Sequence, residues 1–283
     1  MAYKIAYIKS NKFLSVNPAT EFANFAKSNG VDFCVETINA SEISSVSHLN
    51  SFDAVVVGSF SDVAEKAATD IAKKLNLYAK CAFKPIKNSR SAQKDVVLVT
   101  DVAEETHDEF AFNKDFGRET FDTLRYSELE IERTARIAYE LAETRNGKLT
   151  LADTSAPLKT ANLWRKIVSD INEDYLSVHL DFERMYTTAS KLSTSPCEYD
   201  VILAMSTQFD ALSGVLDTFS PLGDGTATVA YLGETTVGVY GTERPATFNR
   251  YFDFLAIEKM LEHSFDLPAL NAIWKDQIGN LTE

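Results

Sequence analysis

The sequence predicts an α/β fold, because strand-like and helix-like segments alternate along most of the chain. Short apolar runs typical of buried strands occur at 4–8, 31–37, 52–59 and 95–100. Helical periodicity lies between them, at 18–29 and 61–76. In the second of these, apolar side chains recur every four residues, at Val63, Ala67, Ile71 and Leu75. Such alternation is typical of parallel sheets covered by helices.

A second run of alternating elements follows an acidic stretch, residues 101–125, which we expect to form a hairpin or an arm. The helix expected at 127–145 begins with Ser127 and Glu130 in capping-box spacing and ends at Asn146-Gly147. Its predicted buried stripe is Ile131, Ala135, Ala138 and Ala142. The other expected elements are strands 149–153, 177–183, 199–205, 224–233 and 235–242, and helices 157–172, 187–194, 246–264, 267–279 and one from about 207.

Composition and charge exclude several classes of partner. The chain has 283 residues, 45% of them hydrophobic, which is enough for a substantial core. Its 28 Lys and Arg against 41 Asp and Glu give a formal charge of −13, which repels nucleic acid and anionic membranes. There is no signal-peptide core and no apolar run of membrane-spanning length. We therefore expect a cytoplasmic, acidic protein that binds neither nucleic acid nor membrane.

The cysteines predict neither a disulfide framework nor a zinc site. Cys34, Cys81 and Cys197 are odd in number, far apart and without a neighbouring C-x-x-C or spaced histidine. Because free cysteine is usually buried, we expect three buried structural thiols. Trp164 and Trp274 have apolar neighbours on helices and are expected to be core or interface anchors.

Three segments carry a family resemblance: "SELEIERTARIAYELAETRNGKLTLADTSAPLKTANLWRKIV" (127–168), "EYDVILAMSTQFDALSGVL" (198–216) and "MLEHSFDL" (260–267). They resemble the β-decarboxylating dehydrogenases, the family of isocitrate, homoisocitrate and 3-isopropylmalate dehydrogenases, and identify the sequence as a shortened, degenerate homologue. The resemblance implies an isopropylmalate-dehydrogenase-like fold of two α/β domains with a central cleft.

The resemblance also implies a domain division and a dimer. A large discontinuous domain would comprise 1–87 plus 220–283, and a small inserted domain would comprise 88–219 with its dimerisation arm at about 101–125. Helices 187–194 and 207–218 match the pair that forms a four-helix interface in the family. A homodimer is therefore the expected state.

The positions that would carry catalysis in the family have changed. The lysine that takes part in proton transfer falls at Thr154, and the family's tyrosine falls near His107. Threonine does not titrate near neutrality, and loss of a general acid or base reduces the rate by about 10²–10⁴. The cofactor-binding asparagine falls at Ala156. The Gly-rich loop after the first strand and the adenosine loop are both replaced, so no NAD(P) site is expected.

The metal site implied by the resemblance needs three carboxylates, two of them one helical turn apart. Their positions are occupied by Asp210, Gly214 and, reaching across from the partner subunit, Thr188. One carboxylate is a poor ligand set for Mg²⁺ or Mn²⁺, so Asp210 is expected to be vestigial.

The substrate-binding arginines of the family fall at positions without positive charge. Those positions are Ala72, Ala82 and Thr100. Four lysines lie near them, Lys73, Lys74, Lys80 and Lys84. A lysine is a point charge and does not reproduce the bidentate pairing of arginine with a carboxylate.

Two functions remain open from the sequence. The first is a non-catalytic homologue that acts as a dimeric binding or regulatory protein, either as a homodimer or as a heteromer with an intact dehydrogenase, without a cofactor. The second is a divergent oxidoreductase that acts on a 2-hydroxy acid with NAD(P) and a divalent metal. It would use Asp153, Thr154, Asp210 and His107.

Overall fold

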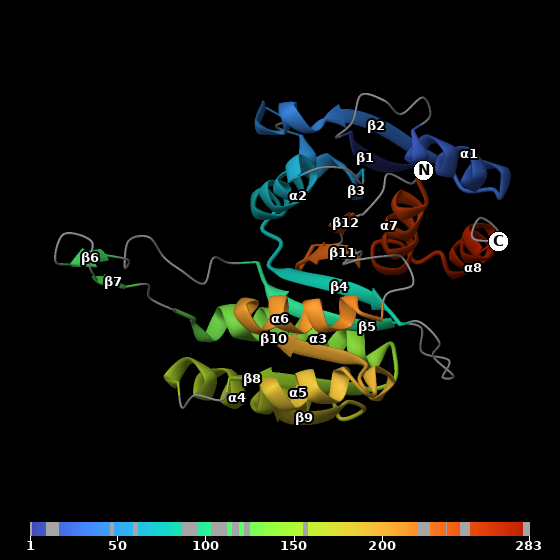
Figure 1. The fold of residues 1–283 in the computed structure, drawn as a ribbon. Coiled ribbons are helices and arrows are strands. Elements are labelled where there is room, and N and C mark those ends of the chain that lie inside the picture. Colours follow the sequence, from blue (N-terminus) through green and yellow to red (C-terminus); the bar gives the residue numbers. More distant parts are fainter. Residues whose placement is uncertain are drawn as a thin grey trace. The chain divides into compact units, whose positions relative to one another are not determined.

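The chain forms two compact units in the computed structural model (Figure 1). One unit is Met1–Pro85 with Asp217–Glu283, and the other is Ile86–Leu216. The structure describes residues 2–9, 17–45, 48–58, 62–86, 95–102, 112–114, 119–121, 125–154, 158–219, 227–235, 237–243 and 250–279. The chain therefore passes from the first unit into the second near residue 85 and returns near residue 217.

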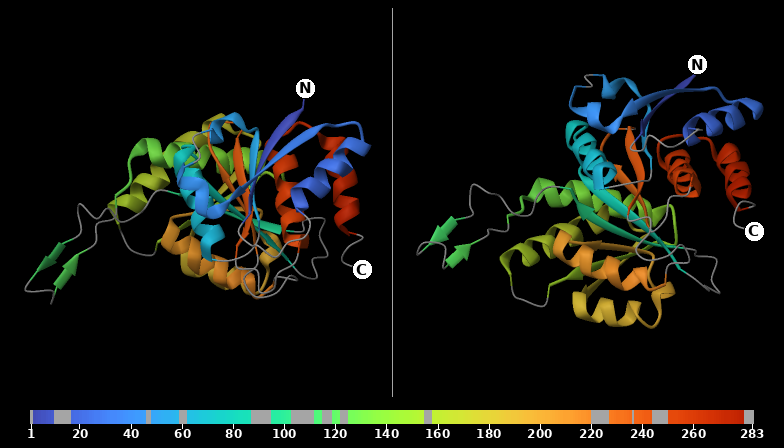
Figure 2. Two further views of the ribbon diagram at one scale, coloured as in Figure 1. Left: turned by 90° about the horizontal axis from the view of Figure 1, so that it is seen from above. Right: turned by 45° about the horizontal axis from the view of Figure 1, so that its top comes forward.

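The first unit is a mixed sheet with helices on both faces. Its strands are β1 (Tyr3–Lys9), β2 (Phe33–Asn39), β3 (Ala54–Val57), β4 (Ala79–Pro85), β11 (Ala227–Leu232) and β12 (Gly238–Glu243). They lie in the order β2-β1-β3-β12-β11-β4, with β11 antiparallel to both of its neighbours. Helix α2 (Asp62–Lys74) lies on one face, and α1 (Pro18–Ser28), α7 (Arg250–His263) and α8 (Pro268–Gly279) lie on the other (Figure 2).

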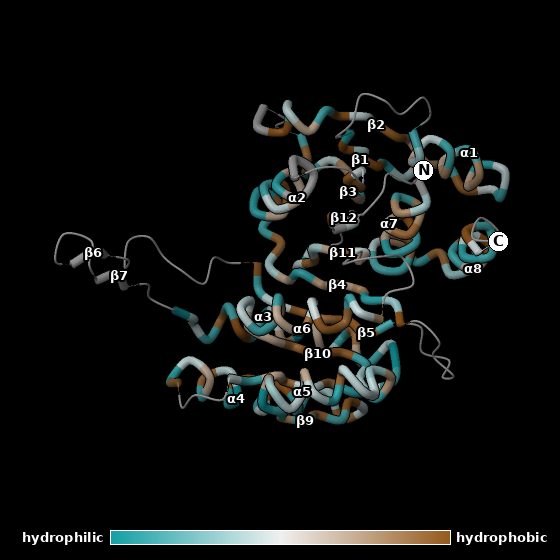
Figure 3. Tube along the Cα trace, in the orientation of Figure 1, coloured by the Kyte–Doolittle hydropathy of each residue, from teal (hydrophilic) through white to brown (hydrophobic). Residues whose placement is uncertain are grey.

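The second unit is a parallel sheet with two helices on each face. Its strands are β5 (Asp95–Asp101), β8 (Lys148–Asp153), β9 (His179–Arg184) and β10 (Val201–Ala204), in the order β5-β10-β8-β9. Helices α3 (Glu128–Glu143) and α4 (Lys159–Ile171) cover one face, and α5 (Met185–Leu192) and α6 (Ser206–Asp217) cover the other (Figures 1 and 2). The buried strand β10 is hydrophobic along its length (Figure 3).

Local sequence accounts for most of the boundaries. The capping box of α3 is confirmed: Ser127 Oγ accepts from the Glu130 amide at 3.3 Å, and Glu130 accepts from the Ser127 amide at 2.6 Å. Helix α3 ends at Glu143, and the turn after it closes at Gly147, whose amide donates to the carbonyl oxygen of Ala142 at 2.9 Å and whose φ of 69° favours glycine. The predicted stripe of α3 is fully buried. Strands β6 (Phe112–Lys114) and β7 (Glu119–Phe121) pair antiparallel, which confirms a hairpin within 101–125.

Two expectations differ from the structure. Strand β4 is not among the predicted elements, because Lys80 and Lys84 interrupt its apolar residues. In the structure, the segment pairs with β11 and Lys84 is buried, so it forms a strand. The prediction of three buried thiols is wrong: Cys81 is buried at the centre of β4, but Cys34 and Cys197 are exposed. Cys34 lies on the edge strand β2 and Cys197 on a single turn of 3-10 helix.

A charged cluster joins α7 and α8 in the first unit. Lys259 Nζ lies 2.9 Å from Glu262 Oε2 and 4.4 Å from the centre of the Phe83 ring. Lys275 of α8 lies 3.9 Å from the same carboxylate. Burial alone would raise the pKa of Glu262, but Lys259, His263 and Lys275 outweigh it and lower that pKa to about 2.

We expect the stabilising effect of Glu262 to depend on pH. Because its pKa is lower in the folded protein than its ordinary value of 4.5, its contribution is present above pH 4.5 and is lost as the pH falls toward 2. The difference in unfolding free energy between wild type and Glu262→Gln should therefore be constant above about pH 5.5 and shrink by about pH 3. Urea titrations across this range measure it. A difference that does not change with pH would contradict the assignment.

Candidate functional site

The carboxyl ends of β5 and β8 carry the acidic residues of the second unit's sheet edge, where α/β enzymes usually place catalytic groups. Asp153 ends β8 and is 4% exposed, and its carboxylate forms an ion pair with Arg165 of α4. Thr154, which the resemblance aligns with the proton-transfer lysine, follows it directly. Asp153 is thus held by its own unit as a structural partner for a helix.

Asp101 occupies the equivalent place on β5. It is 5% exposed, accepts a hydrogen bond of 2.9 Å from Thr134 Oγ1 and lies 3.6 Å from Arg133 Nη2. Both partners belong to α3. Sequence reasoning did not single out Asp101, Arg133 or Arg165. The sequence does contain a signal for these pairs, namely a carboxylate at the end of each strand and basic residues on the helix that follows it.

Asp210 and Gly214 lie one turn apart on α6, and both are exposed. The Asp210 carboxylate therefore faces away from the core of its unit. A Cβ added at Gly214 would meet no atom within 4 Å. The space at Gly214 would therefore accommodate a larger side chain, such as one that carries a carboxylate.

Thr188 lies in a different environment. Its side chain is completely buried on α5, and its hydroxyl donates to Glu183 Oε2 of β9 at 3.2 Å. The same oxygen accepts a 2.6 Å hydrogen bond from Tyr199, and Lys191 forms an ion pair with Glu183. Burial opposes ionisation, but hydrogen bonds from Lys191, Tyr199 and Thr188 lower the pKa of Glu183 below its ordinary value. Thr188 thus stabilises a carboxylate of its own subunit.

The positions of the substrate arginines are inside the protein. Ala72 on α2 and Ala82 on β4 are fully buried in the first unit. Thr100 on β5 is 3% exposed, and its hydroxyl has no hydrogen-bond partner within the described ranges. None of the three can pair with a carboxylate as arginine does.

Two of the nearby lysines have structural partners. Lys84 is 1% exposed and lies 2.6 Å from Asp217 Oδ1, and a buried ammonium needs such a counter-charge. Lys74 donates to the carbonyl oxygen of Ile43 at 2.7 Å. Lys73 and Lys80 also have interactions with the protein.

Some predicted positions cannot be placed. His107 and Ala156 lie outside the described residues, as do residues 10–16 of the replaced loop at 9–19 and residues 244–249 of the replaced loop at 237–252. Among the residues that the structure describes, no three His, Cys, Asp or Glu side chains gather closely enough to hold a metal ion. In that same part of the chain, no helix is long and apolar enough to cross a bilayer.

The fold defines the class of protein. Isocitrate dehydrogenase from Methylococcus capsulatus is similar with a TM-score of 0.74 over 95% of this chain and 88% of that chain, at 17% identity. A β-decarboxylating dehydrogenase from Thermococcus kodakarensis has a TM-score of 0.73 over 98% and 89%, also at 17% identity. The protein therefore has the α/β fold of the isocitrate/isopropylmalate-type dehydrogenases.

The sequence identifies the family as well. The chain belongs to the isocitrate/isopropylmalate dehydrogenase family, whose sequence signature matches residues 53–241. It is 31% identical over 160 residues to 3-isopropylmalate dehydrogenase of Staphylococcus aureus, which is 53% of this chain and 45% of that protein. The same enzyme of Zymomonas mobilis is 32% identical over 163 residues, 53% and 47% of the two chains. The matches thus span about half the length of these relatives.

Proposed function

We propose that this chain is a non-catalytic member of its family that acts as a dimeric binding or regulatory protein. The observation that carries the proposal is the position of Thr188. A metal ligand that completes a partner's site must project out of its own subunit with an oxygen that can bind a cation. Thr188 is instead completely buried, and its hydroxyl is directed to Glu183 of the same subunit.

The remaining donor set does not fit a divalent metal. Mg²⁺ and Mn²⁺ are hard cations that prefer several oxygen ligands, among them carboxylates. Of the three aligned positions, Asp210 supplies one carboxylate, Gly214 supplies none, and Thr188 supplies a neutral hydroxyl already engaged as a donor. This ligand set supports neither polarisation of a hydroxy acid nor stabilisation of an enolate.

Proton transfer lacks a group as well. Thr154 replaces the lysine, and the neighbouring carboxylate of Asp153 is buried and paired with Arg165. Moving the Asp153 carboxylate toward a substrate would break its ion pair with the Arg165 guanidinium. Disrupting an interaction of this kind is costly for the buried partner. The strand end that would supply an acid or base therefore supports the fold.

The structure suggests a surface for the dimer. Tyr186 of α5 keeps 56% of its surface exposed. Large aromatic side chains of this kind are typical anchors of protein interfaces. Helix α5 belongs to the pair for which the resemblance implies an interface. We propose that the partner on this surface is a second copy of the chain; a heteromer with an intact dehydrogenase is the other outcome of the test below.

A divergent oxidoreductase is the second candidate, and one observation favours it. Asp210 remains exposed on α6 beside open space at Gly214. Such an enzyme would bind NAD(P), a divalent metal and a 2-hydroxy acid, with Asp210 as the metal ligand that this chain supplies. It would need its other ligands from groups that the aligned positions do not provide.

The experiment combines assembly and activity. Light scattering of the pure chain should give the mass of a dimer, and Tyr186→Glu should give that of a monomer. A monomeric wild type would overturn self-association and favour the heteromer. Assays with NAD or NADP, Mn²⁺ and malate-type hydroxy acids should show no saturable turnover. Turnover that Asp210→Asn abolishes and the exposed control Asp276→Asn leaves intact would establish the oxidoreductase instead.

A further inference from the structure

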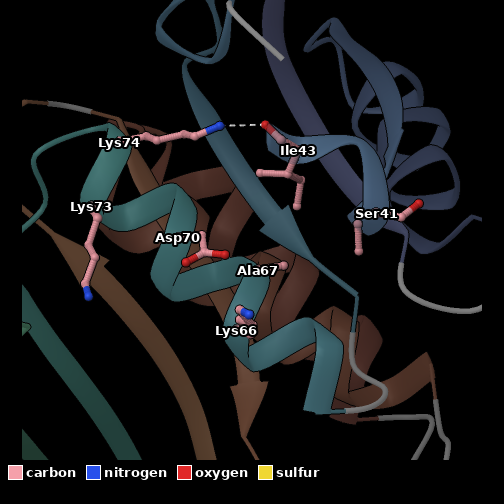
Figure 4. A pocket seen from close by; sticks show the side chains of 8 residues that line it. Ser41, Ile43, Lys66, Ala67, Asp70, Lys73 and Lys74 are labelled. Atoms are coloured by element: carbon pink, nitrogen blue, oxygen red, sulfur yellow. Dashed lines mark hydrogen bonds between the residues drawn. The ribbon is translucent and has the colours of Figure 1, made fainter. Parts of the chain in front are cut away.

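A pocket of about 350 Å³ lies in the first unit, between α2 and the 3-10 helix η1 (Ala40–Ser45) (Figure 4). Its lining includes the buried apolar side chains Ile43 and Ala67 and the charged side chains Lys66, Asp70, Lys73 and Lys74. None of these residues occupies a catalytic, metal or substrate position of the family resemblance. Lys73 and Lys74 follow the substrate-arginine position Ala72 in sequence, but the pocket includes neither Ala72 nor any other position that the resemblance assigns.

Helical spacing collects the charges at this pocket. Lys66, Asp70, Lys73 and Lys74 stand at i, i+4, i+7 and i+8, so they lie along one side of α2. Among the residues that line the pocket, three lysines outnumber one aspartate. The whole chain carries −13, so this positive group contrasts with the rest of the protein. A local surplus of positive charge around a concavity favours an anionic ligand.

One of the lysines is held in place by the protein. Lys74 crosses from the end of α2 to η1, where its Nζ donates to the carbonyl oxygen of Ile43 at 2.7 Å (Figure 4). An ammonium group has three N–H donors, so this bond leaves two for a ligand. Because the side chain is already ordered, binding loses less conformational entropy than it would with a freely rotating lysine.

We propose that this pocket binds a small phosphate-bearing molecule with an organic body, that is, a phosphate monoester. Lysine binds phosphate as a point charge, and Lys66, Lys73 and Lys74 belong to the lining of the pocket. A volume of about 350 Å³ falls in the range of small-molecule sites and exceeds what a phosphate ion fills. Ile43 and Ala67 supply apolar contact for the organic body.

Calorimetric titration with AMP, pyrophosphate and citrate tests the proposal. AMP should bind saturably, and Lys74→Gln should weaken it about tenfold, as expected for loss of one charged hydrogen bond. Glutamine keeps an N–H donor but removes the positive charge. Lys66→Gln, on an exposed side chain, should also weaken binding. Asp70→Asn should strengthen it, because it removes the one negative charge from the lining.

The matched control is Lys166→Gln on α4. Lys166 also lies four residues before an aspartate, with Nζ 3.4 Å from Asp170 Oδ2, but it does not line the pocket. This variant should bind AMP like the wild type. Equal weakening by Lys166→Gln, or no saturable AMP binding, would overturn the proposal. Citrate binding as tightly as AMP would contradict the assignment of a phosphate group to the ligand. Pyrophosphate binding without AMP binding would contradict the assignment of an organic body.

Discussion

Replacement of Asp200 by alanine is expected to lower the free energy of unfolding by about 3–5 kcal/mol, as for other buried ion pairs that lose one partner. Asp200 precedes β10 and is 2% exposed. Its carboxylate accepts from Arg145 Nε at 2.7 Å and from the amide of Asn146 at 2.9 Å. The variant leaves a largely buried guanidinium and a backbone amide without this acceptor. The turn after α3 then loses one of the contacts that attach it to the sheet, while Arg145 keeps its contact with Asp95 of β5.

A comparison within the same network isolates the role of burial. Arg145 Nη2 also lies 2.7 Å from Asp95 Oδ1, but the Asp95 side chain is 20% exposed. Because water can partly solvate the groups that Asp95 would leave, Asp95→Ala should cost less than Asp200→Ala. The exposed Asp170→Ala is the surface control, with an expected loss of about 0–1 kcal/mol. Urea unfolding followed by circular dichroism measures all three. A loss below about 1 kcal/mol for Asp200→Ala would refute the network's role.

Replacement of Trp274 by alanine should destabilise the first unit by about 3–5 kcal/mol, the range for large buried aromatic side chains. Trp274 of α8 is 2% exposed. Its ring centre lies 5.0 Å from Phe22, 5.1 Å from Phe25 and 5.2 Å from Phe254. The indole therefore packs α8 against both α1 and α7. Its loss leaves a cavity that three helices border.

Substitution of each tryptophan by phenylalanine separates packing from hydrogen bonding. Trp274 Nε1 donates to the carbonyl oxygen of Phe254 at 3.2 Å. Trp164 on α4 is equally buried, but its Nε1 has no acceptor within the ranges that the structure describes. Trp274→Phe should therefore cost more than Trp164→Phe, by about 1 kcal/mol for the hydrogen bond and the carbonyl it leaves. Chemical denaturation with tryptophan-independent detection provides the test. Equal losses would contradict the assigned hydrogen bond.

The family-like core and the altered site positions obey different physical constraints. Ile131, Ala135 and the two tryptophans are buried, and their replacement would create cavities. Asp210 and Gly214 are exposed, so their identity affects stability little. Residues at exposed positions of this kind can therefore change while the chain remains folded. This explains how the family fold can persist when such positions differ.

Local sequence by itself determined the alternation of strands and helices, the capping box at Ser127 and the burial of both tryptophans. These features depend on periodicity and on neighbours within a few residues, which are visible along the chain. The resemblance over 127–216 indicated the family, which the comparisons show. The resemblance also aligned Thr154 with a catalytic position and Gly214 with a metal position. Such an alignment depends on residue types alone and needs no structure.

The tertiary structure alone decided what the polar residues of those positions do. Strand β4 exists because β11 pairs with it, and Cys34 is exposed because its strand lies at the sheet edge. Thr188 is directed to Glu183, and Asp153 to Arg165, by packing between a strand and the helix that follows it. The lysine pocket likewise depends on the position of η1 against α2. The pairing of β4 with β11 and the lysine pocket require segments distant in sequence to meet, and hydrophobic periodicity does not indicate which partner a buried polar group will find.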